Sequence, residues 1–312
     1  MANEIKLLDS SLLEDKDKLQ ELDYWFRVMN RPNGWHYDLD HIWVLRELEL
    51  AGILPGSTIV DAGAGQGIMQ YLLSSRGYNV ISLDFSSRVR PSRSTGIFDI
   101  RGNGEALINY KHPYMSFISY GGASGFDLLA RWRLSKLKKL PKLLSGLYRT
   151  SIFMSYYLWE RFVAQHKAYG SITYLRAPFH ATTLRSASAD AVISISAIEH
   201  ADIGLINDNI KELLRILKEK SPLLLTTSAS IKDENEFHEK SSGWCFSLAS
   251  LTSFFPNSEV EFDPANCTRS LMQSQTFIKR LDPYYHQDKD AFCYRKKINK
   301  FPYLPVAVKI IK

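Results

Sequence analysis

The sequence predicts an α/β fold built on a mostly parallel sheet, and two observations support this prediction. Short apolar runs rich in β-branched residues alternate along the chain with segments of helical periodicity. Strands that alternate with helices in this way pair in parallel through right-handed crossovers. A glycine-rich turn, residues 61–67, directly follows the first of these runs. Together they indicate a doubly wound sheet with a ligand site at the carboxyl ends of its strands.

Two amphipathic helices are expected before the sheet, over residues 11–30 and 38–51. In both segments apolar residues recur at helical spacing. A turn at residues 31–34, which contains proline and glycine, separates the two helices. Residues 1–54 are therefore predicted to form a helical N-terminal extension.

Five apolar runs have the composition of buried parallel strands. They cover residues 58–60, 78–83, 172–175, 191–195 and 223–227. Helices are expected at 68–75 and 203–219, and a last strand at 303–311. Residues 55–86 and 171–312 thus form one predicted domain. The segment between them, 87–170, is too long for an ordinary loop, so we expect an inserted helical subdomain.

Composition excludes several classes of protein. Of the 312 residues, 45% are hydrophobic and 23% are charged, as in an ordinary globular protein. The three cysteines lack metal-ligand spacing, so neither a disulfide framework nor a metal site is predicted, and a reducing compartment is favoured. No run reaches the roughly 18 consecutive apolar residues of a membrane span. We therefore expect a cytoplasmic protein.

Positive charge is concentrated in the insertion. Residues 128–159 contain seven Lys or Arg and no Asp or Glu, whereas the whole chain carries a net charge of +6. Leucines recur every three or four residues from Leu134 to Leu147, Pro141 is expected to divide them into two helices, and aromatic residues follow. This pattern fits a helical lid or a helix on an anionic membrane surface. RNA binding would also use the charge, but no RNA-binding motif is present.

The glycine-rich turn is the strongest functional signal. Gly63, Gly65 and Gly67 follow a buried strand and precede a helix, so the backbone can approach a ligand closely. The dinucleotide fingerprint G-x-G-x-x-G fails because its third glycine would fall on Ile68. Asp61 would repel a pyrophosphate but suits a cationic amino acid group. A nicotinamide-dependent dehydrogenase is therefore disfavoured.

A second acid, Asp84, ends the next predicted strand. An acid at this place accepts hydrogen bonds from ribose hydroxyls. Phe85, beside it, is suited to pack on an adenine ring. The two acids together indicate a ligand that combines a nucleoside with an amino acid.

Four motifs resemble those of class I S-adenosylmethionine-dependent methyltransferases. Residues 60–67 read Val-Asp-Ala-Gly-Ala-Gly-Gln-Gly, and residues 81–84 read Ile-Ser-Leu-Asp. Residues 188–200 resemble the fourth-strand region, and 212–218 resemble the helix before the fifth strand. The resemblance covers about residues 55–100 and 170–230. It implies a Rossmann-like, doubly wound sheet of seven mostly parallel strands, with S-adenosylmethionine as cofactor.

The resemblance places cofactor contacts at the ends of four strands. The implied residues are Asp61, Gly63, Ala64, Gly65, Gly67, Asp84, Phe85, Phe179, His180 and Ser196. The family often has an acid after the third strand that binds the adenine amino group. This chain has Arg-Ala-Pro-Phe-His at 176–180, so we expect backbone groups or His180 to serve instead.

Glu199 and His200 follow the fourth strand, whose end faces the transferred methyl group in the family. They are the candidate catalytic residues, because a histidine or carboxylate at this place suits a general base. A helix cap for Glu199 and a packing role for His200 are the structural alternatives.

The expected reaction is methyl transfer to a small-molecule or glycan-type acceptor, as an O-methylation, and a lipid-linked acceptor also fits. Residues 196–199 read Ser-Ala-Ile-Glu and lack the Asn/Asp-Pro-Pro-aromatic turn of enzymes that methylate base amines. No nucleic acid partner is therefore expected. The alternative is a non-catalytic module of the same fold that docks on a partner or on the inner face of the membrane through residues 128–159.

Overall fold

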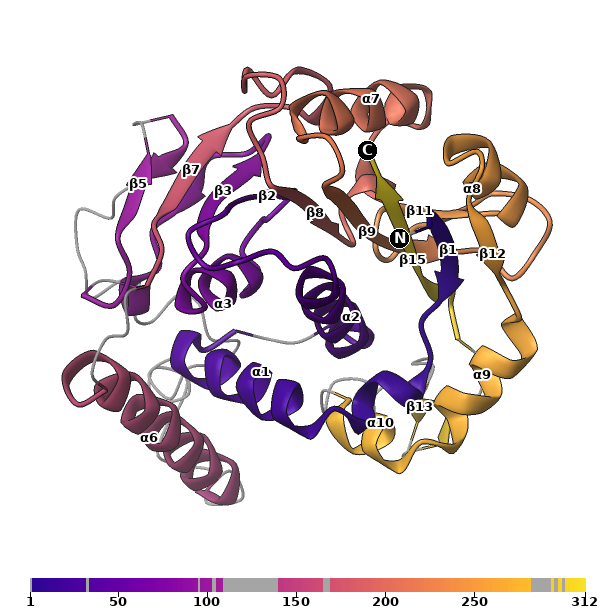
Figure 1. Ribbon diagram of the computed structural model, residues 1–312. Helices are drawn as coiled ribbons and strands as arrows, with labels where there is room; N and C mark the ends of the chain where they lie inside the picture. The colour runs from indigo at the N-terminus through magenta and orange to yellow at the C-terminus, as the bar shows by residue number, and fades with distance from the viewer. Residues whose placement is uncertain are drawn as a thin grey trace.

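The sheet is the centre of the computed structural model (Figure 1). Residues 2–31, 34–94, 96–102, 105–108, 140–164, 169–281, 293–294, 297–298 and 301–312 are described. Within them, eleven strands belong to one sheet, and two further pairs of short strands lie outside it. These pairs are β4 (Arg88–Val89) with β6 (Leu107–Ile108), and β13 (Cys293–Tyr294) with β14 (Lys297–Ile298).

Five parallel strands form the middle of the sheet, in the order β7-β3-β2-β8-β9. Their bounds are Ile172–Arg176, Asn79–Asp84, Thr58–Ala62, Ala191–Ile195 and Pro222–Ala229. Numbered along the chain, this order is 3-2-1-4-5, so the direction of winding reverses between β2 and β8. Doubly wound sheets bind ligands at such a switch point. The prediction of a doubly wound, mostly parallel α/β fold is confirmed.

Additional strands extend both edges of this sheet. β5 pairs with β7 at one edge, and β15, β1 and β12 follow β9 at the other. β15 runs antiparallel to both β9 and β1, and a β10–β11 hairpin pairs with the end of β9. Their bounds are Ile100–Gly102 (β5), Leu304–Ile311 (β15), Glu4–Leu7 (β1), Glu259–Glu261 (β12), Glu236–His238 (β10) and Gly243–Phe246 (β11).

The sheet therefore differs from the seven strands that the family resemblance implies. The extra strands are short, and several contain charged residues, so they do not stand out as apolar runs. Residues 1–54, expected to be helical, also contribute β1 to the sheet. Pairing with β15 rather than local composition explains this strand, since Glu4 lies opposite Lys309 and Ile5 opposite Val308.

Helices cover both faces of the sheet, with α1, α2 and α3 on the inner side of its curve in Figure 1 and α7 on the outer side. Their bounds are Lys16–Met29 (α1), Tyr37–Leu50 (α2), Met69–Ser75 (α3) and Ile206–Ile216 (α7). Three more helices follow β11, namely α8 (Leu248–Phe254), α9 (Pro264–Gln273) and α10 (Gln275–Arg280).

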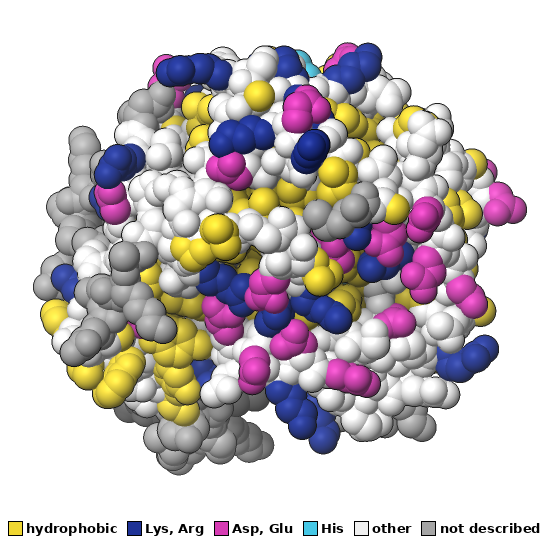
Figure 2. All heavy atoms as spheres, viewed as in Figure 1, with side chains coloured by type: hydrophobic (Ala, Val, Ile, Leu, Met, Phe, Trp, Pro, Cys, Tyr) yellow, Lys and Arg dark blue, Asp and Glu magenta, His cyan; other side chains and the backbone are white. Residues whose placement is uncertain are grey.

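Arg280, the last residue of α10, fixes the helices of the inner layer to one another. Its guanidinium donates to Asp38 of α2 and to Asp23 of α1, each at 2.7 Å in the shorter contact. A planar guanidinium suits such paired carboxylate contacts. Basic and acidic side chains lie interspersed across the centre of the face shown in Figure 2. Arg280 thus ties the start of α2 to α1 and α10.

The described part of the insertion includes one long helix, α6 (Leu140–Phe162), which packs on α1. Pro141 lies in its first turn, a position that tolerates proline. The preceding basic positions, 128–139, lie outside the described residues. Among the described helices, none is long and apolar enough to cross a membrane.

Packing of α7 on the sheet generates a first prediction. Leu213 is fully buried, together with Ile206, Ile210 and Ile216 of the same helix. Leu213→Ala is expected to lower the free energy of unfolding by about 2–5 kcal/mol, because it removes buried surface and leaves a cavity. Leu50→Ala is the control, since Leu50 is 71% exposed. Denaturant unfolding measures both variants, and equal losses would contradict this packing.

Candidate cofactor site

Four loops meet at the carboxyl ends of the central strands, and Gly63 shows how closely they approach. A Cβ atom at this position would lie 2.3 Å from Cβ of Ala197 and 2.8 Å from Cζ of Phe179. Gly63 also has φ of +75°, which favours glycine. The loops that follow β2, β7 and β8 are therefore in contact at a point where no side chain fits.

The loop after β2 is also bound to the end of β3. The backbone N–H groups of Gly63 and Ala64 both donate to the carbonyl of Leu83, at 2.9 and 3.1 Å. The N–H of Gly67 closes the turn by donating to the carbonyl of Ala64 at 3.0 Å. Three of the predicted cofactor residues thus build the turn itself through their backbone.

Asp84 joins this turn to the loop after β3. Its Oδ2 accepts from the N–H of Gly65 at 2.9 Å. Its Oδ1 accepts from the N–H and the hydroxyl of Ser86, at 2.9 and 2.6 Å. A carboxylate offers about four acceptor positions, so these bonds leave about one for a ligand.

Asp61 is buried in β2, with only 3% of its surface exposed. Burial raises the pKa of Asp61 to about 7; nearby Arg88 opposes this rise and the Asp84 carboxylate adds to it. No hydrogen bond contributes to the shift. The guanidinium of Arg88 is itself bound to the hydroxyl and carbonyl of Ser82. Asp61 is thus a buried acid whose charge is poorly compensated, and an added cation would stabilise it.

The side chains predicted to contact adenine lie on the two neighbouring loops. Phe85 is 74% exposed, and its carbonyl accepts from Nε of Arg176 at 3.2 Å. Phe179 is half-buried against the core, and His180 is exposed in the same short turn. The structure therefore brings Phe179 to Gly63 and leaves the rings of Phe85 and His180 open to solvent.

Glu199 and His200 have different environments in the turn after β8. Glu199 is 3% exposed, and its two oxygens accept from the hydroxyls of Ser196 at 2.8 Å and Thr227 at 3.0 Å. Burial raises the pKa of Glu199. His200 is exposed, and its Nδ1 donates to the carbonyl of Ser242 at 3.0 Å. This bond leaves Nε2 of the neutral ring as a proton acceptor.

A buried histidine–aspartate pair lies at the start of α2, and sequence reasoning did not connect its two members. Nδ1 of His36 is 2.7 Å from Oδ2 of Asp40, and the two side chains are 3% and 0% exposed. Oδ1 of Asp40 has no partner among the described residues. The His36 ring is 5.7 Å from that of Tyr303, which precedes β15 and so lies at the carboxyl edge of the parallel strands. The only sequence signal for this pair was the spacing of four positions between His36 and Asp40, which places both on one side of a helix.

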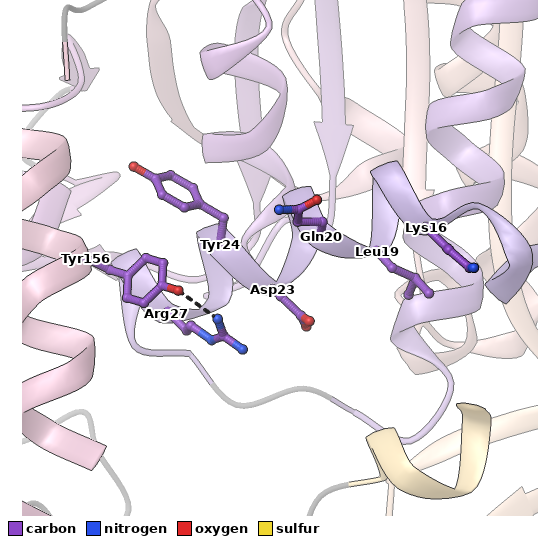
Figure 3. A pocket seen from close by; sticks show the side chains of 7 residues that line it. All are labelled: Lys16, Leu19, Gln20, Asp23, Tyr24, Arg27 and Tyr156. Carbon is purple, nitrogen blue, oxygen red and sulfur yellow. Dashed lines mark hydrogen bonds between the residues drawn. The ribbon is translucent and has the colours of Figure 1, made fainter. Parts of the chain in front are cut away.

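A groove of about 310 Å³ lies apart from these loops, between α1 and α6. Its lining residues are Lys16, Leu19, Gln20, Asp23, Tyr24, Arg27 and Tyr156. Figure 3 shows Tyr156 approaching α1 from α6, where its hydroxyl accepts from Arg27 at 3.0 Å. The groove contains none of the predicted cofactor residues, so the convergence of the strand ends defines the candidate site.

A doubly wound sheet with a glycine turn after its first strand and an acid after its second is a Rossmann-like α/β fold. No protein-family model and no curated protein matches this chain. Similar solved structures include phosphoethanolamine N-methyltransferase 2 of Haemonchus contortus in complex with S-adenosyl-L-methionine. The two chains are 12% identical with a TM-score of 0.45, and the match covers 93% of this chain and 56% of the other.

Two further solved structures match along most of both chains. The YcgJ protein of Bacillus subtilis is 14% identical, with a TM-score of 0.42 and coverage of 87% of this chain and 98% of that one. The [4+2]-cyclase SpnF is 11% identical, with a TM-score of 0.45 and coverage of 90% and 84%. This chain spans little more than half of the Haemonchus enzyme. Likeness at this level assigns neither a substrate nor a residue role.

The contact at Gly63 generates a second prediction. Gly63→Ala is expected to destabilise the fold by about 1–3 kcal/mol more than Gly52→Ala, because overpacking adds to backbone strain. Gly52 is the matched control, since it has φ of +66° and open space around its Cβ position. Thermal unfolding compares the two variants, and equal effects would show that the three loops do not meet at this glycine.

Proposed function

We propose that the chain is an S-adenosylmethionine-dependent methyltransferase acting on a small-molecule or glycan-type acceptor. The observation that carries the proposal is the buried Asp61 carboxylate at the switch point, to which no described residue donates a hydrogen bond that would offset its desolvation. A cationic group beside it would remove this penalty. The amino acid end of S-adenosylmethionine carries such an ammonium group, whereas the phosphates of a dinucleotide would meet repulsion.

The surrounding residues fit the rest of this cofactor. The remaining acceptor position of Asp84 suits a ribose hydroxyl, and the exposed ring of Phe85 offers a stacking surface for adenine. The backbone of Gly63 and Gly65 lets the ligand approach the turn closely. When bound, the cofactor supplies the methyl group together with its sulfonium leaving group.

We assign acceptor binding to the carboxyl edge of the sheet, where the turn after β8 and the start of α2 both lie. His200 holds a proton on Nδ1 and is open at Nε2, so it suits removal of a proton from an acceptor hydroxyl. His36, oriented by Asp40, is a second base candidate at the same edge. Glu199 is bound on both oxygens, so we assign it the positioning of the turn rather than proton transfer.

These assignments favour O-methylation, because a hydroxyl needs a base more than an amine does. They also favour an enzyme over a non-catalytic module of the same fold. The two histidines at this edge, His36 and His200, are not among the residues assigned to cofactor binding, so proton transfer gives them a role. Methyl transfer to any acceptor, followed with a labelled methyl group, separates the two.

Binding of S-adenosylhomocysteine tests the proposal. The wild-type protein is expected to bind it in isothermal calorimetry. Asp84→Ala should weaken binding roughly 10- to 150-fold, since the loss of charged hydrogen bonds costs about 1.5–3 kcal/mol. Asp208→Ala is the control, because the Asp208 side chain is 57% exposed on α7. Absence of binding by folded wild-type protein would overturn the proposal.

The raised pKa of Asp61 predicts a pH-dependent affinity. In the protein without ligand, the pKa of Asp61 is about 7, whereas pairing with the ammonium group of the ligand requires the charged carboxylate. Affinity for S-adenosylhomocysteine should therefore rise about 10- to 30-fold between about pH 5.5 and 7.5. In the free protein the same shift makes stability fall as the pH rises from about 4 to about 7.

Asp61→Asn should remove both dependences. Calorimetry at several pH values, together with denaturant unfolding of the free protein, measures them. A wild-type affinity that does not change over this range would contradict the pairing of Asp61 with the ammonium group.

A further inference from the structure

The turn of the β10–β11 hairpin holds two histidine rings at the carboxyl edge of the sheet. β11 pairs with the end of β9 through Cys245 and Phe246, so the hairpin lies where the parallel strands end (Figure 1). His238 is the last residue of β10, and His200 comes from the turn after β8. The proposed function uses His200 and gives His238 no role.

The two rings lie on the same side of the hairpin. His238 pairs across the hairpin with Gly243, and the Cβ positions of such a pair are about 5 Å apart on one face. A Cβ atom on Gly243 would lie 3.0 Å from Cε1 of His200 and 3.1 Å from its Nδ1. The rings of His238 and His200 are therefore neighbours, and glycine at position 243 leaves the space that His200 occupies.

Tyr303 places this pair beside the second base candidate. The His238 ring is 5.4 Å from the ring of Tyr303, and the His36 ring is 5.7 Å from it. Both histidines meet the tyrosine edge to face. His238 thus belongs to the edge of the sheet to which we assign acceptor binding.

Hydrogen bonds within the turn decide which nitrogen of His238 carries the proton. The N–H of Ser241 donates to the carbonyl of His238 at 3.2 Å and to Nδ1 of its ring at 3.3 Å. The hydroxyl of Ser241 is 2.8 Å from the same nitrogen. A backbone N–H can only donate, so Nδ1 accepts and the proton of the neutral ring is on Nε2. Burial, together with Lys240, lowers the pKa of His238, which keeps the ring neutral at neutral pH.

His200 has the opposite arrangement. Its Nδ1 donates to the carbonyl of Ser242 at 3.0 Å, which leaves Nε2 as the acceptor. Ser242 follows Ser241 in the same turn, so one turn orients both rings. The result is a hydrogen-bond donor, Nε2 of His238, next to an acceptor, Nε2 of His200. No described residue is bound to either of these two atoms.

We propose that the methyl acceptor carries its reacting hydroxyl next to a second oxygen, as a vicinal diol does. The reacting hydroxyl binds at Nε2 of His200, and the second oxygen accepts from Nε2 of His238. The two histidines bind different oxygens, because a donor on the reacting oxygen would occupy the lone pair that takes the methyl group. This assignment rests on the proposed function, since it takes the acceptor to bind at this edge.

The two histidines have different parts in the transfer. The hydroxyl oxygen forms the new bond to the methyl carbon, and its proton passes to Nε2 of His200, which becomes an imidazolium. The bond between the methyl carbon and sulfur breaks, and its electron pair stays on the sulfur. His238 keeps its proton throughout, so it selects and orients the acceptor.

Long-range proton–nitrogen NMR spectra of the histidine rings test the donor and acceptor assignment on the full chain, without any ligand. His238→Gln and His200→Gln identify the signals of the two rings. At neutral pH we expect the proton on Nε2 in His238 and on Nδ1 in His200. A proton on Nδ1 of His238 or on Nε2 alone of His200 would overturn the proposal.

Binding of probe molecules tests the preference for two neighbouring oxygens. The probes are catechol against phenol, and vicinal cis-cyclohexanediol against cyclohexanol, each titrated by NMR with S-adenosylhomocysteine present. The wild-type protein should bind the diol of at least one pair roughly 3- to 10-fold more tightly, the effect of one hydrogen bond. His238→Leu should remove this preference, whereas His238→Gln should keep it, because the amide nitrogen also donates.

Glu239→Leu is the matched control, since Glu239 is the exposed neighbour of His238 in the same turn. Its preference for the diol should equal that of the wild type. Equal affinities in both pairs, or a preference that His238→Leu leaves unchanged, would overturn the proposal. Wild-type protein that binds S-adenosylhomocysteine but shows no such preference would contradict the diol assignment and leave the cofactor proposal intact.

Discussion

The close approach of three loops at Gly63 is the constraint on which the candidate site depends. A glycine is needed there because the turn after β2 leaves no space between Ala197 and Phe179. The same turn is bound to Leu83 through two N–H groups and to Asp84 through a third. The ends of β2, β3, β7 and β8 are thus held together by the chain's own contacts. A site built in this way loses little conformational freedom when it binds.

Within this frame, the negative charges of the two acids are compensated to different degrees. Asp84 is held by three hydrogen bonds, whereas Asp61, one strand away, is buried and receives none from the residues that the structure describes. The guanidinium of Arg88 is engaged by Ser82 and only partly offsets the burial of Asp61. Asp84 therefore organises the loops, whereas the charged form of Asp61 would be stabilised by an added cation. Groups of this kind concentrate at functional sites.

The central sheet could be predicted from sequence because its evidence is local. Strands β2, β3, β8 and β9 are apolar runs, and the glycine turn is contiguous in the chain. Strand β1, with the sequence Glu-Ile-Lys-Leu, carries no such signal, because its pairing with β15 depends on residues some three hundred positions away. The position of the His36–Asp40 pair beside Tyr303 could not be predicted either, because Tyr303 is also distant in the sequence.

The site shows the same division between local and distant information. The residues of the turn and Asp84 are recognisable as a motif, but the buried state of Glu199 depends on Thr227 of the next strand. The attachment of α6 depends on Tyr24, Arg93 and Tyr169, which are scattered along the chain. Periodicity reveals that a helix has two sides, and only tertiary contacts decide which of them is inside.

The pairing of β1 with β15 has a consequence for biosynthesis. β15 fills the position between β1 and β9, and β12 pairs with the other side of β1, so β1 has no strand to bind until β12 (Glu259–Glu261) has left the ribosome. During translation the edge of β9 and the segment that becomes β1 both stay open to other chains. Contacts between such distant residues form slowly, and open strand edges favour aggregation. A chaperone that shields nascent strands would therefore raise the yield of native protein, most of all when elongation is slow.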